Sequence, residues 1–284
     1  MKKIMAALLA LALGCAFSLV AQHKGVQAAT GDSAGNAATG VTAPTGPAVS
    51  AGESVAQAAM KKASDAQKYL YLFIAGNDSE ETATARRAVE AAVAKLADKA
   101  DAAFINKDSA AEKGIIEKLR LAGAPMPIVL AMAPNGAITG AYFAEKLKDP
   151  QLQDSIAGAG EQQCMKALQE NKLVFLCVQN DATKSNDAAM QGVNEFKADA
   201  RFSEVTEIVK VNPASAPDQG LLAKLKVDPA VTEATTVFVV PPGSLVSKVE
   251  GATSKDALVS ALTAATSGGC GGGKCGPGAC GPKK

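Results

Sequence analysis

The segment GAPMPIVLAMAPNGAITG, residues 123–140, carries the signals of a β-hairpin that follows a helix. Gly123 is a typical helix-ending residue, and Pro127 precedes an apolar run from Ile128 to Met132. Pro134-Asn135-Gly136 is a turn sequence, after which a second strand-like stretch runs back. Residues 235–251, TTVFVVPPGSLVSKVEG, repeat strand, Pro-Gly turn and strand about a hundred residues later. The chain is therefore predicted to use one structural unit twice.

The composition fits two globular domains and excludes some classes of partner. The chain has 284 residues, of which 48% are hydrophobic, so each of two domains can bury a core. Aromatic residues make up 4% and Trp is absent, so these cores must consist mostly of aliphatic side chains. The formal net charge of +1 gives no electrostatic reason to expect binding to nucleic acid or to an anionic membrane surface.

The N-terminus has the pattern of an export signal. Lys2-Lys3 precede an apolar run that ends near Ala21, as in a secretory signal peptide of residues 1–21. Cleavage is expected near residue 21 or 28; alternatively, Leu13-Gly14-Cys15 is a lipobox-like sequence in which Cys15 would be lipidated. Both alternatives place the protein in the bacterial periplasm or cell envelope. Contact with a membrane is expected only through the signal or a lipid anchor.

Four further segments follow the signal. Residues 22–53 are rich in Gly, Ala, Ser, Thr and Pro, and are predicted to form a flexible linker. His23, the only histidine, lies there and is interpreted as a solvated residue. Residues 54–160 and 161–267 are predicted to form two α/β domains, and residues 268–284 form a tail rich in Gly and Cys.

Both predicted domains have the element order β-α-β-α-β-β-α after a leading helix. Asp78 with Glu81, and Ser109 with Glu112, have capping-box spacing at two helix starts of the first copy. That copy is predicted to contain a helix at 54–67, a strand at 69–75, a helix ending near 97, a strand at 102–105, a helix ending at 123, the hairpin, and a helix around 145–157. The second copy is predicted to contain a helix at 161–171, a strand at 173–179, a helix at 185–198, a strand at 205–211, a helix at 218–226, the hairpin, and a helix at 254–265.

This order, with a proline at the start of the third strand, resembles the thioredoxin-like fold superfamily. The resemblance implies two tandem domains, each with a central mixed sheet flanked by helices and, in the family, a cis proline beside the active site. Pro127 matches that proline in the first copy, whereas the second copy has Thr235-Thr236 there. The family's Cys-x-x-Cys motif is replaced by Asn77-Asp78-Ser79-Glu80 and by Asn180-Asp181-Ala182-Thr183.

The lost motif argues against redox catalysis by the domains. A reactive dithiol needs a thiolate stabilised by a helix N-terminus or a nearby cation, and neither helix start has a cysteine. No catalytic residue is therefore predicted; the sequence favours a non-catalytic protein but leaves open whether it is an enzyme. Arg86-Arg87, in the helix that follows, is interpreted as part of a solvated face.

Two cysteines lie in the second predicted domain. Cys177 falls in the apolar strand LVFLCVQ and is interpreted as a small buried hydrophobe. Cys164 lies in the preceding helix, and its role is left open. If helix and strand diverge from a turn near Asn171, Cys164 lies roughly 10 Å along the helix and Cys177 roughly 20 Å along the strand. A disulfide needs Cα atoms within about 7 Å, so this geometry argues against a bridge without settling the question.

The tail, GGCGGGKCGPGACGPKK, is the main candidate for chemistry. Cys270, Cys275 and Cys280 are spaced evenly, with four residues between neighbours that are mostly Gly, Pro and Ala. Three soft sulfur ligands on such a chain could converge on one metal ion, and thiolates favour Cu(I) or Zn(II). Tetrahedral zinc would lack a fourth ligand, so three-coordinate Cu(I) fits the count better. No other cofactor is predicted. The same cysteines could instead oxidise in a pair, join two chains, or belong to a low-complexity tail without selective binding.

Three functional hypotheses follow. The first is an exported, non-catalytic tandem thioredoxin-like protein whose tail binds soft metal or exchanges thiols. The second is a redox-inactive interaction module for an unidentified protein partner, with an incidental tail. The third is a thiol-disulfide oxidoreductase that uses the tail thiols.

Overall fold

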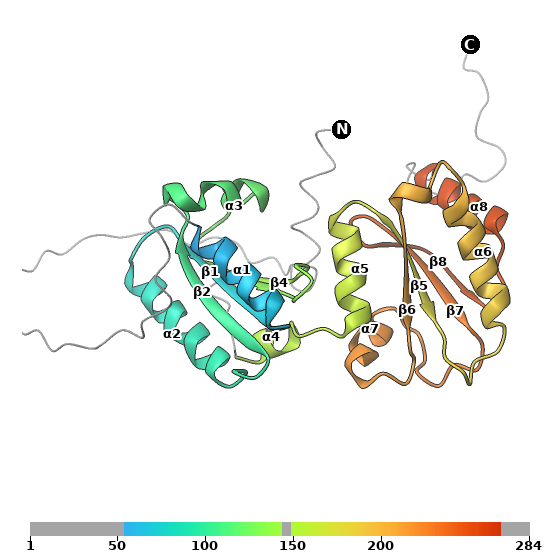
Figure 1. Cartoon of the computed structure of the whole chain (residues 1–284), viewed down its shortest axis with the longest axis horizontal. Helices are drawn as coiled ribbons and strands as arrows, with labels where there is room; N and C mark the ends of the chain where they lie inside the picture. The colour runs from blue at the N-terminus through green and yellow to red at the C-terminus, as the bar shows by residue number, and fades with distance from the viewer. Residues whose placement is uncertain (1–53, 144–148, 268–284) are drawn as a thin grey trace, which may run out of the picture. The chain divides into compact units, whose positions relative to one another are not determined.

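The computed structural model describes residues 54–143 and 149–267 and contains two four-stranded sheets (Figure 1). The strand order is β2-β1-β3-β4 in one sheet and β6-β5-β7-β8 in the other. We call the first sheet with α1–α3 the first unit, and the second sheet with α5–α8 the second unit. Within the described residues, no helix combines the length and the apolar character needed to cross a membrane.

The first unit has the predicted order of elements. It comprises α1 (Val55–Asp65), β1 (Tyr69–Ala75), α2 (Glu80–Ala94), β2 (Ala100–Asn106), the 3-10 turn η2 (Ala110–Glu112), α3 (Lys113–Lys118), β3 (Ile128–Met132) and β4 (Ile138–Phe143). The short helix α4 (Asp149–Asp154) follows in the chain. Residues 144–148, at the start of the helix predicted around 145–157, lie outside the described residues.

The second unit repeats this order. It comprises α5 (Ala159–Gln169), β5 (Leu173–Val178), α6 (Asn186–Ala198), the turn η4 (Ser203–Val205), β6 (Thr206–Val211), the turn η5 (Ala216–Asp218), α7 (Gln219–Lys224), β7 (Thr235–Val240), β8 (Ser244–Glu250) and α8 (Lys255–Ser267).

The sequences of strands β1 and β5 are almost entirely apolar, and both faces of each strand are covered. Six of the seven β1 residues are buried, and so are five of the six β5 residues. β1 pairs in parallel with β2, and β5 pairs in parallel with β6. β5 also pairs antiparallel with β7, which makes the second sheet mixed. Continuous apolar sequence of this kind is typical of parallel strands buried on both sides.

Both predicted hairpins are present. In the first, Gly136 has φ +80°, and the Ala133 amide donates to the Ala137 carbonyl at 2.8 Å. The Asn135 side chain accepts from the Ala137 amide at 3.0 Å, which explains the Asn-Gly turn chemistry. In the second hairpin, β7 pairs antiparallel with β8 and the turn contains the cis bond Pro241-Pro242.

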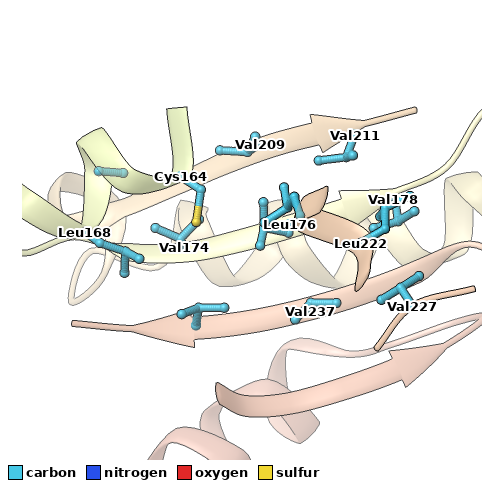
Figure 2. Close-up of a cluster of buried hydrophobic side chains, with 13 residues drawn as sticks. Cys164, Leu168, Val174, Leu176, Val178, Val209, Val211, Leu222, Val227 and Val237 are labelled. Atoms are coloured by element: carbon cyan, nitrogen blue, oxygen red, sulfur yellow. The ribbon is translucent and has the colours of Figure 1, made fainter. Parts of the chain in front are cut away.

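The second sheet separates two apolar clusters. One cluster lies under α5 and α7 and includes Cys164, Val174, Leu176 and Val178 (Figure 2). The other lies under α6 and α8 and includes Phe175, Cys177, Phe196, Phe238 and Leu258. Successive β5 side chains alternate between these clusters, because side chains of a strand point to opposite faces in turn. Figure 1 shows α6 and α8 on one side of this sheet and α5 with α7 on the other.

A buried carboxylate anchors the leading helix of each unit. Glu112 is 2% exposed and accepts from the Ser54 hydroxyl at 2.7 Å and from the Val55 amide at 2.6 Å. Asp218 is 6% exposed and accepts from the Gly160 amide at 3.1 Å. The helix-start donor and the carboxylate are 58 residues apart in both units. Each acid therefore satisfies free donors at the start of a helix that is distant in sequence.

These contacts correct the predicted capping boxes. The Ser109 side chain makes no cap hydrogen bond, because its partner Glu112 is turned toward α1 instead. At α2 the cap is Ser79, whose hydroxyl accepts from the Thr82 amide at 3.2 Å, so the predicted pair of Asp78 and Glu81 is shifted by one residue.

Candidate functional site

The start of α2 in the first unit occupies the place where the resemblance puts a redox motif. Ser79 caps the helix, and the Asn77 side chain accepts from the Thr82 hydroxyl at 3.2 Å and from the Ser79 amide at 3.3 Å. Asn77, Asp78, Ser79 and Glu80 are all exposed. These hydrogen bonds hold the loop in a defined conformation, but its side chains provide no thiol nucleophile.

Pro127 lies beside this loop. The Met126–Pro127 bond is cis, Pro127 is buried, and Met126 is half-buried. A Cβ atom placed on Gly76 would lie 3.8 Å from the Met126 Cβ, so the chain leaving β1 runs close to the residue before the proline. Among the described residues, no hydrogen bond joins the 76–79 loop to residues 124–127. No backbone hydrogen bond therefore bridges the surface between the loop and the segment before Pro127.

Both units have a thioredoxin-like fold. Strand order, the parallel first pair and the hairpin establish it in each unit, and the cis proline beside the helix start adds to it in the first. The second unit departs at this point, because Thr235 and Thr236 occupy the start of β7 and are both buried.

The corresponding surface of the second unit is closed. Lys184 forms an isolated parallel bridge with Glu233: its amide donates to the Thr232 carbonyl, and its carbonyl accepts from the Ala234 amide, both at 2.9 Å. The Ser185 hydroxyl also donates to the Glu233 carboxylate at 2.8 Å. The loop before α6 is thereby joined to the segment before β7, and a peptide could not pair with these backbone groups unless the bridge opened.

The two cysteines of the second unit are inaccessible. Cys164 is 5% exposed and Cys177 is 2% exposed, and both are free thiols on opposite faces of the sheet. Figure 2 shows the Cys164 sulfur among aliphatic side chains. Burial raises the pKa of each thiol from 9.0 to about 12, because the thiolate would be desolvated. Cys177 is thus the small buried hydrophobe that its strand predicts, and the sheet prevents it from pairing with Cys164.

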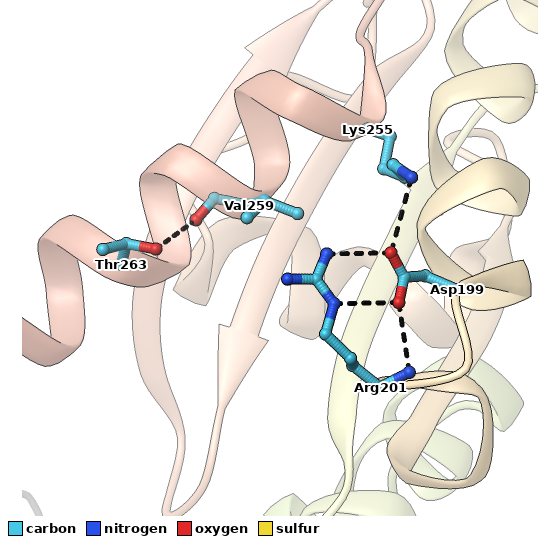
Figure 3. Close-up of polar contacts among 5 residues, drawn as sticks. All are labelled: Asp199, Arg201, Lys255, Val259 and Thr263. Carbon is cyan, nitrogen blue, oxygen red and sulfur yellow. Dashed lines mark hydrogen bonds and ion pairs between the residues drawn. The ribbon is translucent and has the colours of Figure 1, made fainter.

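A charged cluster holds the end of α6 to the start of α8. Asp199 accepts from Arg201 Nε at 2.9 Å, from an Arg201 terminal nitrogen at 2.8 Å, and from Lys255 Nζ at 3.4 Å (Figure 3). These donors, with Arg201 contributing most, hold the pKa of Asp199 well below its usual value. One carboxylate binds both cations and joins the two helices, so we interpret the cluster as a structural clamp.

Most of the predicted site residues lie outside the described residues. They are Cys15, Cys270, Cys275 and Cys280, and His23 is also outside. Of the predicted site residues, Pro127 alone falls in the described part of the chain. Within residues 54–143 and 149–267, no cluster of three or more His, Cys, Asp or Glu side chains could hold a metal ion.

Arg86 is exposed, as predicted for a solvated face, but sequence reasoning missed its contacts. Its guanidinium lies 4.3 Å from the centre of the Phe104 ring, and its Nε donates to Glu90 at 2.9 Å. The spacing of Arg86 and Glu90, four residues apart on a helix, was a signal for this pair. Contact with Phe104 depends on β2 and could not be inferred from helix spacing.

Comparison with known proteins finds solved structures that are weakly similar to this chain. No family model and no curated protein matches the chain. Among solved structures it is similar to the first two thioredoxin domains of Saccharomyces cerevisiae Eps1p, with 8% identity over 76% of this chain and 98% of that chain and a TM-score of 0.30. It is also similar to the NTD_N/C domain of alkylhydroperoxide reductase AhpF from Enterococcus faecalis (15% identity, 72% and 98% coverage, TM-score 0.25). A third is the zinc-bound form of human ERp44 (8% identity, 71% and 55% coverage, TM-score 0.30). Likenesses this weak assign no activity.

Proposed function

We propose that this protein is an exported pair of redox-inactive thioredoxin-like units whose thiol chemistry resides in the C-terminal cysteines. In this proposal Cys270, Cys275 and Cys280 bind one soft metal ion, with Cu(I) favoured over Zn(II), or exchange thiols with a partner. The two units provide a stable, non-catalytic body to which the tail is attached.

The burial of Cys164 and Cys177 supports this proposal most directly. Each thiol has a pKa raised to about 12, so at neutral pH almost none of either is the reactive thiolate. They lie on opposite faces of one sheet, so they cannot act together as a dithiol or as a metal site. Thiol chemistry, if the protein has any, must then come from cysteines outside the two units.

Copper fits the tail because of ligand number and ligand type. Cu(I) accepts three soft thiolates, whereas tetrahedral zinc would need a fourth ligand from elsewhere. Ordering a Gly-rich segment costs conformational entropy, and strong metal–thiolate bonds are needed to offset it. Affinity should therefore depend on all three sulfurs and fall at low pH, where protons compete for them.

The experiment is an anaerobic competition for Cu(I) against a chromophoric chelator, using the full-length reduced protein. We expect one Cu(I) per chain and a loss of affinity of at least tenfold when any one tail cysteine is replaced by Ser. A truncation ending at Ser267 should retain none. Replacing His23 should change nothing, which makes His23→Ala the matched control.

Two outcomes would redirect the assignment. Equal copper retention by the full-length protein and by the triple Cys270→Ser, Cys275→Ser, Cys280→Ser variant would end the metal proposal. Turnover of a disulfide substrate that is lost in the same triple variant would favour thiol exchange by the tail. The truncation ending at Ser267 should show no turnover in either case.

An interaction module is the second candidate, and the open surface beside Pro127 favours it. That surface is unbridged in the first unit and bridged in the second. A panel of extended peptides should shift the backbone amide signals of residues 76–79 and 126–128 and leave those of residues 183–185 and 233–236 unchanged. Equal shifts in both regions, or none in either, would argue against this candidate.

A further inference from the structure

The first unit contains a hollow of about 290 Å³ between the start of α2 and the ends of β1 and β2. The residues that line it include Phe73, Phe104, Asp78, Thr82, Ala83 and Arg86. The carboxyl ends of parallel strands in open α/β sheets are common ligand sites, and the hollow lies at the ends of such a pair. No cysteine lines it, so an inference about it does not rest on the proposed function.

Two of the residues that line the hollow are aromatic. The Phe73 and Phe104 ring centres lie 5.7 Å apart and the rings are tilted by 49°. Phe73 is buried, whereas Phe104 is half-buried and has the Arg86 guanidinium over its ring, 4.3 Å from the ring centre. Such a surface can accept a flat apolar group, because burying apolar area there is favourable and aromatic edges and faces attract each other.

Asp78 and Arg86 are the charged residues that line the hollow, and the first turn of α2 beside it adds Glu80 and Glu81. Asp78, Glu80 and Glu81 are exposed, and within the described residues none of the three forms an ion pair. The cation of this set, Arg86, is compensated by Glu90 at 2.9 Å. The N-terminus of α2 contributes only about half a positive charge, which the carboxylates of its first turn outweigh.

The second unit lacks this combination. Phe73 and Phe104 are register partners at the fifth position of β1 and β2, and the equivalent partners in β5 and β6 are Cys177 and Lys210. A thiol and an ammonium-bearing chain replace the two rings there. The aromatic pair is therefore specific to the first unit and is not a general consequence of the fold.

We propose that this hollow binds a small organic cation in which an ammonium group is attached to a flat apolar body. The apolar body packs against the Phe104 side chain beside Arg86, and the ammonium group faces the Asp78 carboxylate. An anion of the same shape is disfavoured because the carboxylates at the start of α2 repel it. A single exposed charge of this kind changes affinity by about fivefold in water.

Benzylammonium and benzoate are suitable probes because they share the ring and differ in the sign of charge. Each is titrated at pH 7 into the full-length, isotope-labelled protein while backbone amide signals are followed. Benzylammonium should shift signals of residues 73–86 and 104–106 with a dissociation constant at least about fivefold lower than that of benzoate. Asp78→Asn should reduce that ratio to below about twofold.

A pair of variants on neighbouring residues separates binding in the hollow from general surface effects. Ala83→Leu fills the hollow and should weaken benzylammonium binding at least tenfold. Thr84→Leu places the same side chain next to it, outside the hollow; it removes only an exposed hydrogen bond from Arg87 and should leave binding unchanged. Both residues are exposed on α2, so both variants should fold. Circular dichroism checks the fold of each variant. Equal binding of the two probes, or undiminished binding by folded Ala83→Leu protein, would overturn the proposal.

Discussion

The two units differ most at the surface beside the start of their second helix. In the first unit the 76–79 loop and the segment before Pro127 are not hydrogen-bonded to each other, whereas in the second unit Lys184 bridges to Glu233. Neither helix start has a cysteine, so neither can provide a thiol nucleophile. The two units therefore share this feature and differ in whether the backbone bridges the surface around it.

The same two units share a feature that local sequence does not reveal. Glu112 and Asp218 are buried carboxylates that anchor the starts of α1 and α5, and each lies 58 residues after the donor it binds. Glu112 accepts from one hydroxyl and from backbone amides, whereas Asp218 accepts from the Gly160 amide and from the Ser215 hydroxyl at 3.0 Å. The repeat therefore extends to a specific long-range contact as well as to the strand order.

Of the substitutions proposed here, those that remove Glu112 or Asp218 should lower the free energy of unfolding most. Glu112→Ala should lower the free energy of unfolding of the first unit by about 2–4 kcal/mol, because buried donors lose a charged acceptor. Asp218→Ala should cost the second unit about 1–3 kcal/mol, since it leaves fewer backbone donors unpaired. The chain's three tyrosines, Tyr69, Tyr71 and Tyr142, all lie in the first sheet, so tyrosine fluorescence reports on that unit.

Urea unfolding followed by both tyrosine fluorescence and circular dichroism tests this comparison. Glu112→Ala should move the tyrosine transition to lower urea. Asp218→Ala should move the dichroism transition and leave the tyrosine transition in place. A tyrosine transition shifted equally by both variants would show that the two carboxylates do not act on separate units.

Much of this architecture could be predicted from the sequence. The apolar runs of β1 and β5, the turn residues of the two hairpins and Pro127 were enough to indicate the fold and the missing redox motif. Glu112 was assigned to a local capping box because Ser109 stands three residues before it, but its carboxylate binds donors 56–58 residues away. The bridge between Lys184 and Glu233 is equally long-range. Spacing within a helix cannot reveal contacts that depend on how distant segments pack.

Alkaline pH should destabilise the second unit through its thiols. Their folded pKa values of about 12 exceed the unfolded value near 9, so stability is complete below pH 9 and is lost as pH rises toward 12. Each thiol contributes a slope of up to about 1.4 kcal/mol per pH unit in this window. Between residues 54 and 160 the chain has no cysteine, so the first unit lacks this term.

The measurement is the urea midpoint of the second unit at pH 8.0, 9.5 and 10.5, compared between the wild-type protein and Cys177→Ala. The variant is expected to be less stable at pH 8.0 but to lose less stability on going to pH 10.5. Parallel curves for the two proteins would contradict burial of the Cys177 thiol.

Replacing Asp199 by Asn should have the smallest effect on stability. Its pKa is lowered in the folded state, so its contribution to stability is present above the unfolded value of about 3.9 and is lost as the pH falls below it. Asp199→Asn should therefore lower the melting temperature at pH 7 and have less effect at pH 3. The matched control is Asp98→Asn in the first unit, since Asp98 is exposed and forms no ion pair within the described residues. A pH-independent difference for Asp199→Asn would contradict an ionic role.

The central claim is that the two thiols of the second unit are buried and unreactive, whereas the three thiols of the tail are reactive. Alkylation of the native protein tests this claim most directly. The full-length reduced protein is treated briefly with N-ethylmaleimide at pH 7, with and without urea, and each cysteine is quantified by mass spectrometry of peptides. We predict complete labelling of Cys270, Cys275 and Cys280 without urea, and labelling of Cys164 and Cys177 only in urea. Labelling of Cys164 or Cys177 in the native protein, at the rate of the tail cysteines, would contradict the account.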